Sequence, residues 1–234
     1  MNKPARPPFP YLQPLRLVAM ALVTLAVPIL CFTTAVRVLA LSPGFYQWGQ
    51  ERHVIYSEPS STARAAADLA LVRYFDADAG TLGSQLRAVG LAEDFFGERE
   101  RAHLKDVHSL IQSVKWLQLI SAMFLAATLV LVGLRRVRSG WRSAMRALRL
   151  GAGITWGIII LLAVGSLLDF DALFLQFHLL SFSNDLWQLN PNHDNLIRMF
   201  PTAFFLEAAL AATAAAGAQA SLIGGLALWN LRRQ

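Results

Sequence analysis

Residues 174–205 read FLQFHLLSFSNDLWQLNPNHDNLIRMFPTAFF and form the most distinctive stretch of the chain. Bulky apolar residues are interleaved there with polar and amphipathic ones: His178, Asn184, Asp185, Trp187, Asn190, His193, Asp194 and Arg198. A long apolar run lies on each side, so we expect the stretch at or near a membrane surface. Polar groups held in that setting are costly and usually serve a function.

The composition indicates a polytopic membrane protein. The chain has 234 residues, of which 55% are hydrophobic and 15% charged, with a mean hydropathy of +0.44. A soluble domain normally carries about 25% charged residues. The single cysteine, Cys31, lies within an apolar run, which excludes an intramolecular disulfide and a cysteine-based metal site.

Four apolar runs are long enough to cross a bilayer as helices. They cover about residues 15–41, 111–134, 150–168 and 201–231. The first follows basic residues like a signal peptide, but it exceeds the roughly 7 to 15 apolar residues of one, so we interpret it as an uncleaved anchor. The predicted fold is all-α, a single integral membrane domain over residues 1–234 with four transmembrane helices.

The segments between the runs have mixed patterns. Apolar residues recur at helical spacing over residues 62–74, and a second helical pattern runs from Glu98 without a break into the second apolar run. We expect loops at residues 76–90, which contain three glycines, and at residues 135–149. Residues 42–110 are therefore predicted to form a largely helical cap.

The distribution of charge predicts the topology. Eleven of the 21 lysines and arginines lie in the tail up to Arg16, in residues 135–149 and at the C-terminus, and these segments hold none of the 15 acidic residues. The positive-inside rule then places both termini in the cytoplasm. The cap and residues 169–200 are expected on the exoplasmic side. The net charge of +6 thus reflects membrane topology, and we expect no nucleic-acid partner.

The segment ERERAHLKDVHSL, residues 98–110, is the first candidate for chemistry. On a helix, Glu100, His103 and Asp106 share one face, whereas His108 points elsewhere. A carboxylate one turn from a histidine can fix its tautomer and raise its basicity. The alternative is a solvated helix next to the membrane that carries charge pairs.

The second candidate is the opening stretch itself. Phe170, Leu173, Phe174, Phe177 and Leu180 follow helical spacing, which predicts a short interfacial helix bordered by His178. The SNDLW and LNPNHD segments have the composition of turns. The alternative is an interfacial loop in which Trp187 is a belt residue and the Asn and Asp side chains are caps.

A third candidate joins the first and fourth runs. Arg37 and Glu207 both lie toward the outer side of the membrane and could form a pair, or Arg37 could hold an anionic or carbonyl oxygen. The alternative is that Arg37 only extends to the interface. The chain lacks G-x-S-x-G, H-E-x-x-H and Walker motifs, and its histidine spacings match no strong metal pattern, so we expect no cofactor and no metal.

Several motifs resemble a known family. They are ERAHLKDV at residues 100–107, FH at 177–178, NDLW at 184–187, PNHDNLI at 191–197 and MFPxxFF at 199–205. Together they resemble the bacterial integral-membrane family that contains the lipoprotein intramolecular transacylases, over nearly the whole chain. Ser181-Phe182-Ser183 departs from the paired aromatic residues that the family has at this point.

The resemblance implies a function in the bacterial inner membrane, with an active site at the exoplasmic face. The substrate would be a diacylglyceryl-modified lipoprotein, and the enzyme would move the sn-2 acyl chain to the α-amine of the N-terminal cysteine. The product would be an N-acyl lyso-form lipoprotein. The motif histidines fall on His103 and His178.

The chemistry of acyl transfer suggests roles for the candidate residues. We expect His178 as general base with Asp185 as its orienting partner, and His103, near Asp106, as acid or oxyanion donor, although the two histidine roles could be exchanged. Residues expected to bind substrate are Asn184, Trp187, Asp194, Arg37 and Glu100, and membrane lipid is a further expected partner. The alternatives are a non-catalytic membrane scaffold and a lipid hydrolase. A single cavity lined by both histidines would favour the enzyme hypothesis over the scaffold hypothesis.

Overall fold

The computed structural model describes residues 12–76, 80–134 and 138–233 and, within them, consists of helices and connecting loops without a strand. Four helices are long: α1 (Leu12–Ala40), α5 (Glu98–Leu134), α6 (Arg138–Ser181) and α8 (Thr202–Arg232). Four are short: α2 (Pro43–His53), α3 (Ser61–Asp76), α4 (Leu82–Ala88) and α7 (Asn195–Met199). The N-terminal tail, for which we expect a cytoplasmic location, lies largely outside the described residues.

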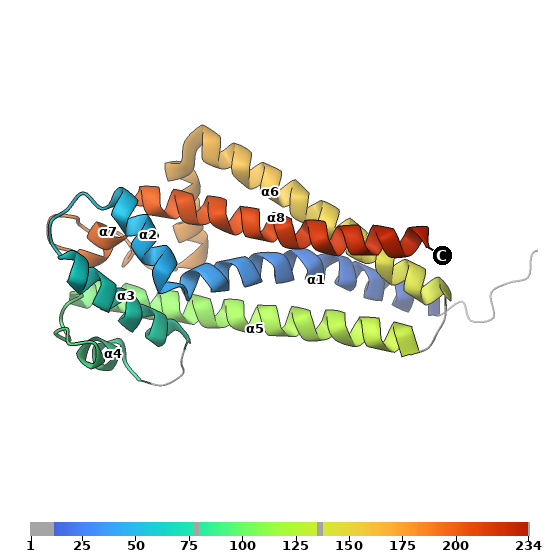
Figure 1. The fold of residues 1–234 in the computed structure, drawn as a ribbon, viewed down its shortest axis with the longest axis horizontal. Helices are drawn as coiled ribbons and strands as arrows, with labels where there is room; N and C mark the ends of the chain where they lie inside the picture. The colour runs from blue at the N-terminus through green and yellow to red at the C-terminus, as the bar shows by residue number, and fades with distance from the viewer. Residues whose placement is uncertain (1–11, 77–79, 135–137, 234) are drawn as a thin grey trace, which may run out of the picture.

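The long helices form an elongated bundle with the short ones gathered at one end. Figure 1 shows α1, α5 and α8 running alongside one another while α6 crosses the bundle, and the C-terminus lies at the end away from the short helices. The four long helices are long and apolar enough to cross a membrane. The predicted all-α fold with four transmembrane helices is therefore confirmed.

One spanning helix extends well beyond the bilayer. Helix α5 has 37 residues, which corresponds to about 55 Å at a rise of about 1.5 Å per residue. A hydrocarbon core is only about 30 Å thick. The first turns of α5, which carry His103, therefore project toward the cap.

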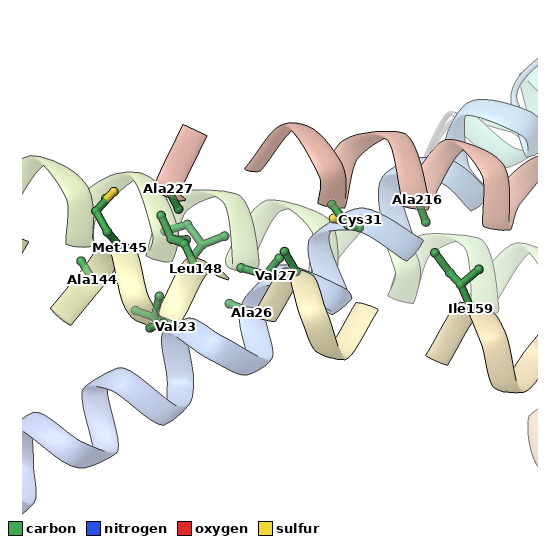
Figure 2. Close-up of a cluster of buried hydrophobic side chains, with 14 of the residues drawn as sticks. Val23, Ala26, Val27, Cys31, Ala144, Met145, Leu148, Ile159, Ala216 and Ala227 are labelled. Carbon is green, nitrogen blue, oxygen red and sulfur yellow. The ribbon is translucent and has the colours of Figure 1, made fainter. Parts of the chain in front are cut away.

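Small side chains allow α1 to lie at the centre of the bundle. It packs against α5, α6 and α8, and Figure 2 shows Ala26, Val27 and Cys31 of α1 among residues of the neighbouring helices. A Cβ atom on Gly151 of α6 would lie 2.6 Å from the carbonyl oxygen of Thr24. Glycine is therefore required where α6 crosses α1, as is common for close helix packing in lipid.

The cap is fastened to the bundle at several points. A Cβ atom on Gly49 of α2 would lie 2.5 Å from the ring of Phe204 on α8, so α2 rests directly on that ring. At the C-terminus of α3, the carbonyl oxygen of Phe75 accepts a hydrogen bond from Gln112 of α5 at 2.8 Å. The backbone of two cap helices is thus held by two of the spanning helices.

Two of the expected loops are wrong. Residues 82–88 form α4. Thr81 caps the first turn of this helix, because its Oγ1 accepts a hydrogen bond from the Ser84 N–H at 3.3 Å. Helix α6 begins at Arg138, inside the predicted 135–149 loop, whose residues 135–137 lie outside the described part. Arginine and alanine are good helix formers, so a basic segment with this composition continues the helix that follows it.

Helix α6 is broken by a kink at Asp169. The backbone of Asp169 is extended (φ −162°, ψ 93°), and its carboxylate accepts a hydrogen bond from the Ala172 N–H at 2.9 Å. Asp169 therefore caps a second helical segment. This segment turns back behind the bundle (Figure 1) and contains the short helix that the apolar spacing predicts.

Candidate active site

Two histidines from distant parts of the sequence meet beneath the cap. His103 lies on the projecting part of α5, and His178 lies in the last turn of α6. Their ring centroids are 6.3 Å apart, and the two residues are only 7% and 8% exposed. The kink in α6 makes this meeting possible, because it returns the end of the helix to the bundle.

A backbone carbonyl fixes the tautomer of His178. Its Nδ1 lies 2.8 Å from the carbonyl oxygen of Phe174, one turn earlier in the helix. A carbonyl oxygen can only accept a hydrogen bond, so Nδ1 carries the hydrogen. The lone pair is then on Nε2, which makes that atom the proton acceptor of the ring.

Aromatic side chains surround both histidines. We call Phe174, Phe177, Phe182 and Trp187 the aromatic cluster. Ring centroids lie 4.4 Å (Phe174) and 4.8 Å (Trp187) from His178, while Phe182 is 5.0 Å from His103 and 5.8 Å from His178. Buried imidazoles in such apolar surroundings favour the neutral form.

The carboxylates that share a helix face with His103 are occupied by other groups. Both oxygens of Glu100 accept backbone hydrogen bonds at 2.6 Å, from the N–H groups of Gly97 and Leu196. Asp106 accepts from Asn184 Nδ2 at 2.8 Å. His103 Nδ1 is buried and finds no hydrogen-bond partner among the described residues. The helical-face argument thus places these residues together, but neither carboxylate is hydrogen-bonded to this nitrogen.

Asp185 does not contact His178 Nδ1, contrary to the expectation from the sequence. Its carboxylate lies 3.3 Å from the guanidinium of Arg99 on α5. Arg99 also donates to the backbone carbonyls of Asp185 and of Gln188, the latter at 3.2 Å. The Phe174 carbonyl, and not Asp185, is therefore the group that orients His178. Asp185 instead helps to attach the loop after α6 to α5.

The loop after α6 holds the remaining predicted residues. Trp187 Nε1 donates to the carbonyl of Asn184 at 2.9 Å, which keeps the indole beside His178. Asp194 is 7% exposed, accepts from the Asn190 N–H at 2.7 Å and lies 2.7 Å from His193 Nδ1. The hydrogen bonds of Asp194 are therefore within its own loop.

The suggested pair between Arg37 and Glu207 is wrong. Arg37 donates to Gln118 at 3.1 Å and lies 3.4 Å from the carboxylate of Asp76. Glu207 lies 3.0 Å from Arg52 on α2. Both residues therefore join different helices from those expected, and Glu207 attaches the cap to α8.

Sequence reasoning missed three residues of the site: Arg99, Phe174 and Phe182. The position of Phe174 one helical turn before His178 is a signal that its carbonyl is within reach. Arg99 gave no signal, because it bonds mainly backbone carbonyls of a loop 86 and 89 residues away. Among the described residues, no group of three or more His, Cys, Asp or Glu side chains could hold a metal ion.

Comparisons with known proteins agree with the resemblance. The family model described as lipoprotein intramolecular transacylase Lit matches residues 21–205. No curated protein matches the chain. The solved in meso structure of the membrane integral lipoprotein intramolecular transacylase Lit from Bacillus cereus is similar, with a TM-score of 0.79, 18% identity, and coverage of 94% of this chain and 97% of that one.

Two variants of the Bacillus cereus protein are also similar. Each has one histidine replaced, by arginine or by alanine, and they match with TM-scores of 0.69 and 0.70 at 16% identity. Both matches cover 95% of this chain, and 95% and 96% of the other chains. These likenesses show a shared fold. Because the family model covers most of its length, the chain belongs to the lipoprotein intramolecular transacylase family.

Proposed function

We propose that this protein moves the sn-2 acyl chain of a diacylglyceryl-modified N-terminal cysteine to the α-amine of the same cysteine. The product is an N-acyl lyso-form lipoprotein. The observation that carries the proposal is the pair of buried histidines, His103 and His178, with centroids 6.3 Å apart in an apolar site. Family membership supplies the class of substrate.

The proposed reaction converts an ester into an amide without water. The amine nitrogen attacks the ester carbonyl carbon, the bond to the glycerol oxygen breaks, and the proton lost by nitrogen ends on that oxygen. An α-amine titrates at about 7.7 to 8.0, so a neutral imidazole can take its proton near neutral pH. Holding amine and ester together supplies much of the rate enhancement.

His178 is the base in this proposal. Its Nδ1–H is engaged by the Phe174 carbonyl, which leaves Nε2 to accept the proton of the amine. His103 then donates a hydrogen bond to the oxyanion or to the leaving glycerol oxygen, and that oxygen receives the proton that His178 took from the amine. Asn184 can add a donor, since only one of its two amide N–H groups is needed for Asp106.

The aromatic cluster supports acyl transfer over hydrolysis. Two ring centroids lie 4.4 Å and 4.8 Å from the centroid of His178, so the base has apolar neighbours. Excluding water from the site prevents hydrolysis of the ester as a side reaction. The sequence further supports an exoplasmic site with both termini in the cytoplasm, from the segregation of basic and acidic residues.

Mass spectrometry of lipoprotein N-termini tests the proposal. Purified protein is mixed with two diacylglyceryl lipoproteins, one of which carries isotopically heavy acyl chains. We expect N-acyl lyso-forms in which each label stays on its own lipoprotein. Scrambled label, or an acyl group trapped on Cys31 or a serine, would instead require an acyl-enzyme. Free fatty acid without N-acylation would identify a hydrolase, and unchanged lipoproteins a scaffold.

A further inference from the structure

An apolar groove lies between α1 and α6 at the end of the molecule away from the cap. It has a volume of about 450 Å³ and is lined by Met20, Ala21, Thr24, Leu25, Arg146, Ala147 and Leu150. This volume is within the range of about 300 to 1,000 Å³ that is typical of small-molecule sites. The groove is independent of the histidine site, because none of its residues belongs to the cap or to the aromatic cluster.

The floor of the groove offers no free polar group. Thr24 is 8% exposed, and its hydroxyl donates to the Met20 carbonyl at 2.9 Å. The same hydroxyl lies 3.4 Å from the Ala147 carbonyl of α6. With this hydroxyl satisfied, the groove presents methyl and methylene groups, which suit a hydrocarbon chain.

Arg146 lies at the outer end of the groove. Helices α1 and α6 both begin at this end of the bundle (Figure 1), so Met20 and Arg146 precede Leu25 and Leu150 along the direction toward the cap. Arg146 is exposed and has no hydrogen bond or ion pair within residues 12–76, 80–134 and 138–233. An apolar groove therefore ends at an unpaired guanidinium group.

The chain has no acidic side chain with which to pair this arginine. All 15 aspartates and glutamates lie within residues 51–106 and 169–207, and none of these residues lines the groove. An anion that pairs with Arg146 would therefore come from outside the chain.

We propose that this groove binds one anionic phospholipid. An acyl chain lies along Thr24, Ala147 and Leu150, and the phosphate and anionic headgroup contact Arg146. Basic pockets between transmembrane helices recognise such headgroups, and arginine pairs with phosphate through two parallel N–H donors. The occupant is thus a lipid of the leaflet that surrounds the ends of α1 and α6.

Native mass spectrometry of the full chain in detergent tests this site. The protein is incubated with equal amounts of phosphatidylglycerol and phosphatidylcholine that carry the same acyl chains. We expect one retained lipid with a preference for phosphatidylglycerol. In Arg146→Gln the ratio of the two adducts should fall about fivefold, as expected for removing one arginine beside an anionic lipid. Arg149→Gln, which removes the same charge one turn away and does not line the groove, should keep the ratio.

A second variant tests the groove itself. Ala21→Trp fills it from its exposed edge and should reduce binding of both lipids, with an unchanged unfolding temperature. Equal retention of the two lipids, unaffected by Arg146→Gln, would mean annular lipid only and overturn the proposal. Lipid binding that appears only after removal of residues 1–11 would overturn it too, because the chain's own N-terminal segment would then be the occupant.

Discussion

The carboxylate of Glu100 on α5 accepts a hydrogen bond from the backbone N–H of Leu196 on α7, at 2.6 Å. Its other oxygen accepts from the N–H of Gly97 before α5, also at 2.6 Å. The first N–H groups of a helix lack partners within the helix. One buried side chain thus caps two helices and ties the loop after α6 to the helix that carries His103.

Replacing Glu100 should affect stability through these caps. Glutamine has only one accepting oxygen, so Glu100→Gln leaves one buried N–H unpaired, and the free energy of unfolding should fall by about 1 to 3 kcal/mol. Thermal unfolding in detergent measures this, with Glu98→Gln on the exposed first turn of α5 as the unchanged control. A Glu100→Gln protein with unchanged stability and no activity would instead assign Glu100 to the chemistry.

The two site histidines should be essential for acyl transfer. General acid–base groups typically contribute about 10² to 10⁴ in rate, so His103→Ala and His178→Ala should each lower the initial rate of lyso-form production by at least about 100-fold. His108→Ala should keep most activity, because His108 bonds the Tyr74 carbonyl at 2.8 Å on the other side of α5. Comparable losses at His103 and His108, at equal protein levels, would contradict this assignment.

Substitutions of Arg99 and of Asp185 should lower the rate of acyl transfer by different amounts. In Asp185→Asn, Arg99 still bonds the carbonyls of Asp185 and Gln188, so the rate should fall only a few-fold. Arg99→Gln loses all three contacts and releases the loop that holds Trp187, so we expect a loss of at least about tenfold with partial rescue by Arg99→Lys. If Asp185→Asn is as inactive as His178→Ala, Asp185 takes part in catalysis.

The cap contains a carboxyl group whose ionisation should oppose folding. Asp68 on α3 is fully buried and accepts from Gln50 of α2 at 2.8 Å. Burial raises the pKa of Asp68 from 3.8 to about 7, against the smaller opposing effects of the Gln50 hydrogen bond and the Arg64 charge. Between about pH 4 and 7 the folded protein holds this proton more tightly than the unfolded chain, so stability falls as the pH rises.

Asp68→Asn should remove this dependence. The unfolding free energy of the native protein should drop by at most about 4 kcal/mol across that window, and the variant should lack this decrease and be more stable at pH 8. Thermal unfolding between pH 4 and 8 measures both, with the exposed Asp94→Asn as control. An identical pH profile in the variant and the native protein would contradict the role of Asp68.

Topology is open to direct measurement. Cysteines placed at Ser139, at the start of α6, and at Ser84, in α4 of the cap, should react with an impermeant thiol reagent from opposite sides of the membrane. Native Cys31 is fully buried and should contribute little background. Equal labelling of both positions in intact cells would contradict the orientation that we derive from the charges.

The sequence predicts the fold well because the length of an apolar run and the helical spacing of its residues are local properties. Four runs of apolar residues predict the four long helices, and the spacing of Glu100, His103 and Asp106 predicts their common face on α5. The pattern does not predict α4, because Gly83 inside this helix and Gly80 and Gly90 beside it are typical of a loop. The pattern does not predict a helix at residues 138–149, because many arginines between two apolar runs are typical of a loop.

Partners within the site were harder to predict, because they depend on tertiary contacts with the backbone. Arg99 donates to two loop carbonyls, and His178 bonds one helix carbonyl. A sequence pattern indicates pairs of side chains, but it does not indicate which backbone carbonyl lies near a side chain. Asp185 was therefore assigned to the histidine, and Arg37 to Glu207. In the folded chain, Asp185 of the loop lies beside Arg99 of α5, and Glu207 lies beside Arg52 of α2.

Under the proposed function, the attachment of the cap limits how a substrate can arrive. With α2 resting on Phe204 through Gly49, and α3 held by Gln112, lifting the cap would break packing and hydrogen bonds with two spanning helices. A lipid-anchored polypeptide can instead diffuse within the plane of the bilayer and approach the histidines from the side. The least costly entrance is then a lateral one, so the rate of encounter would depend on the fluidity of the surrounding lipid.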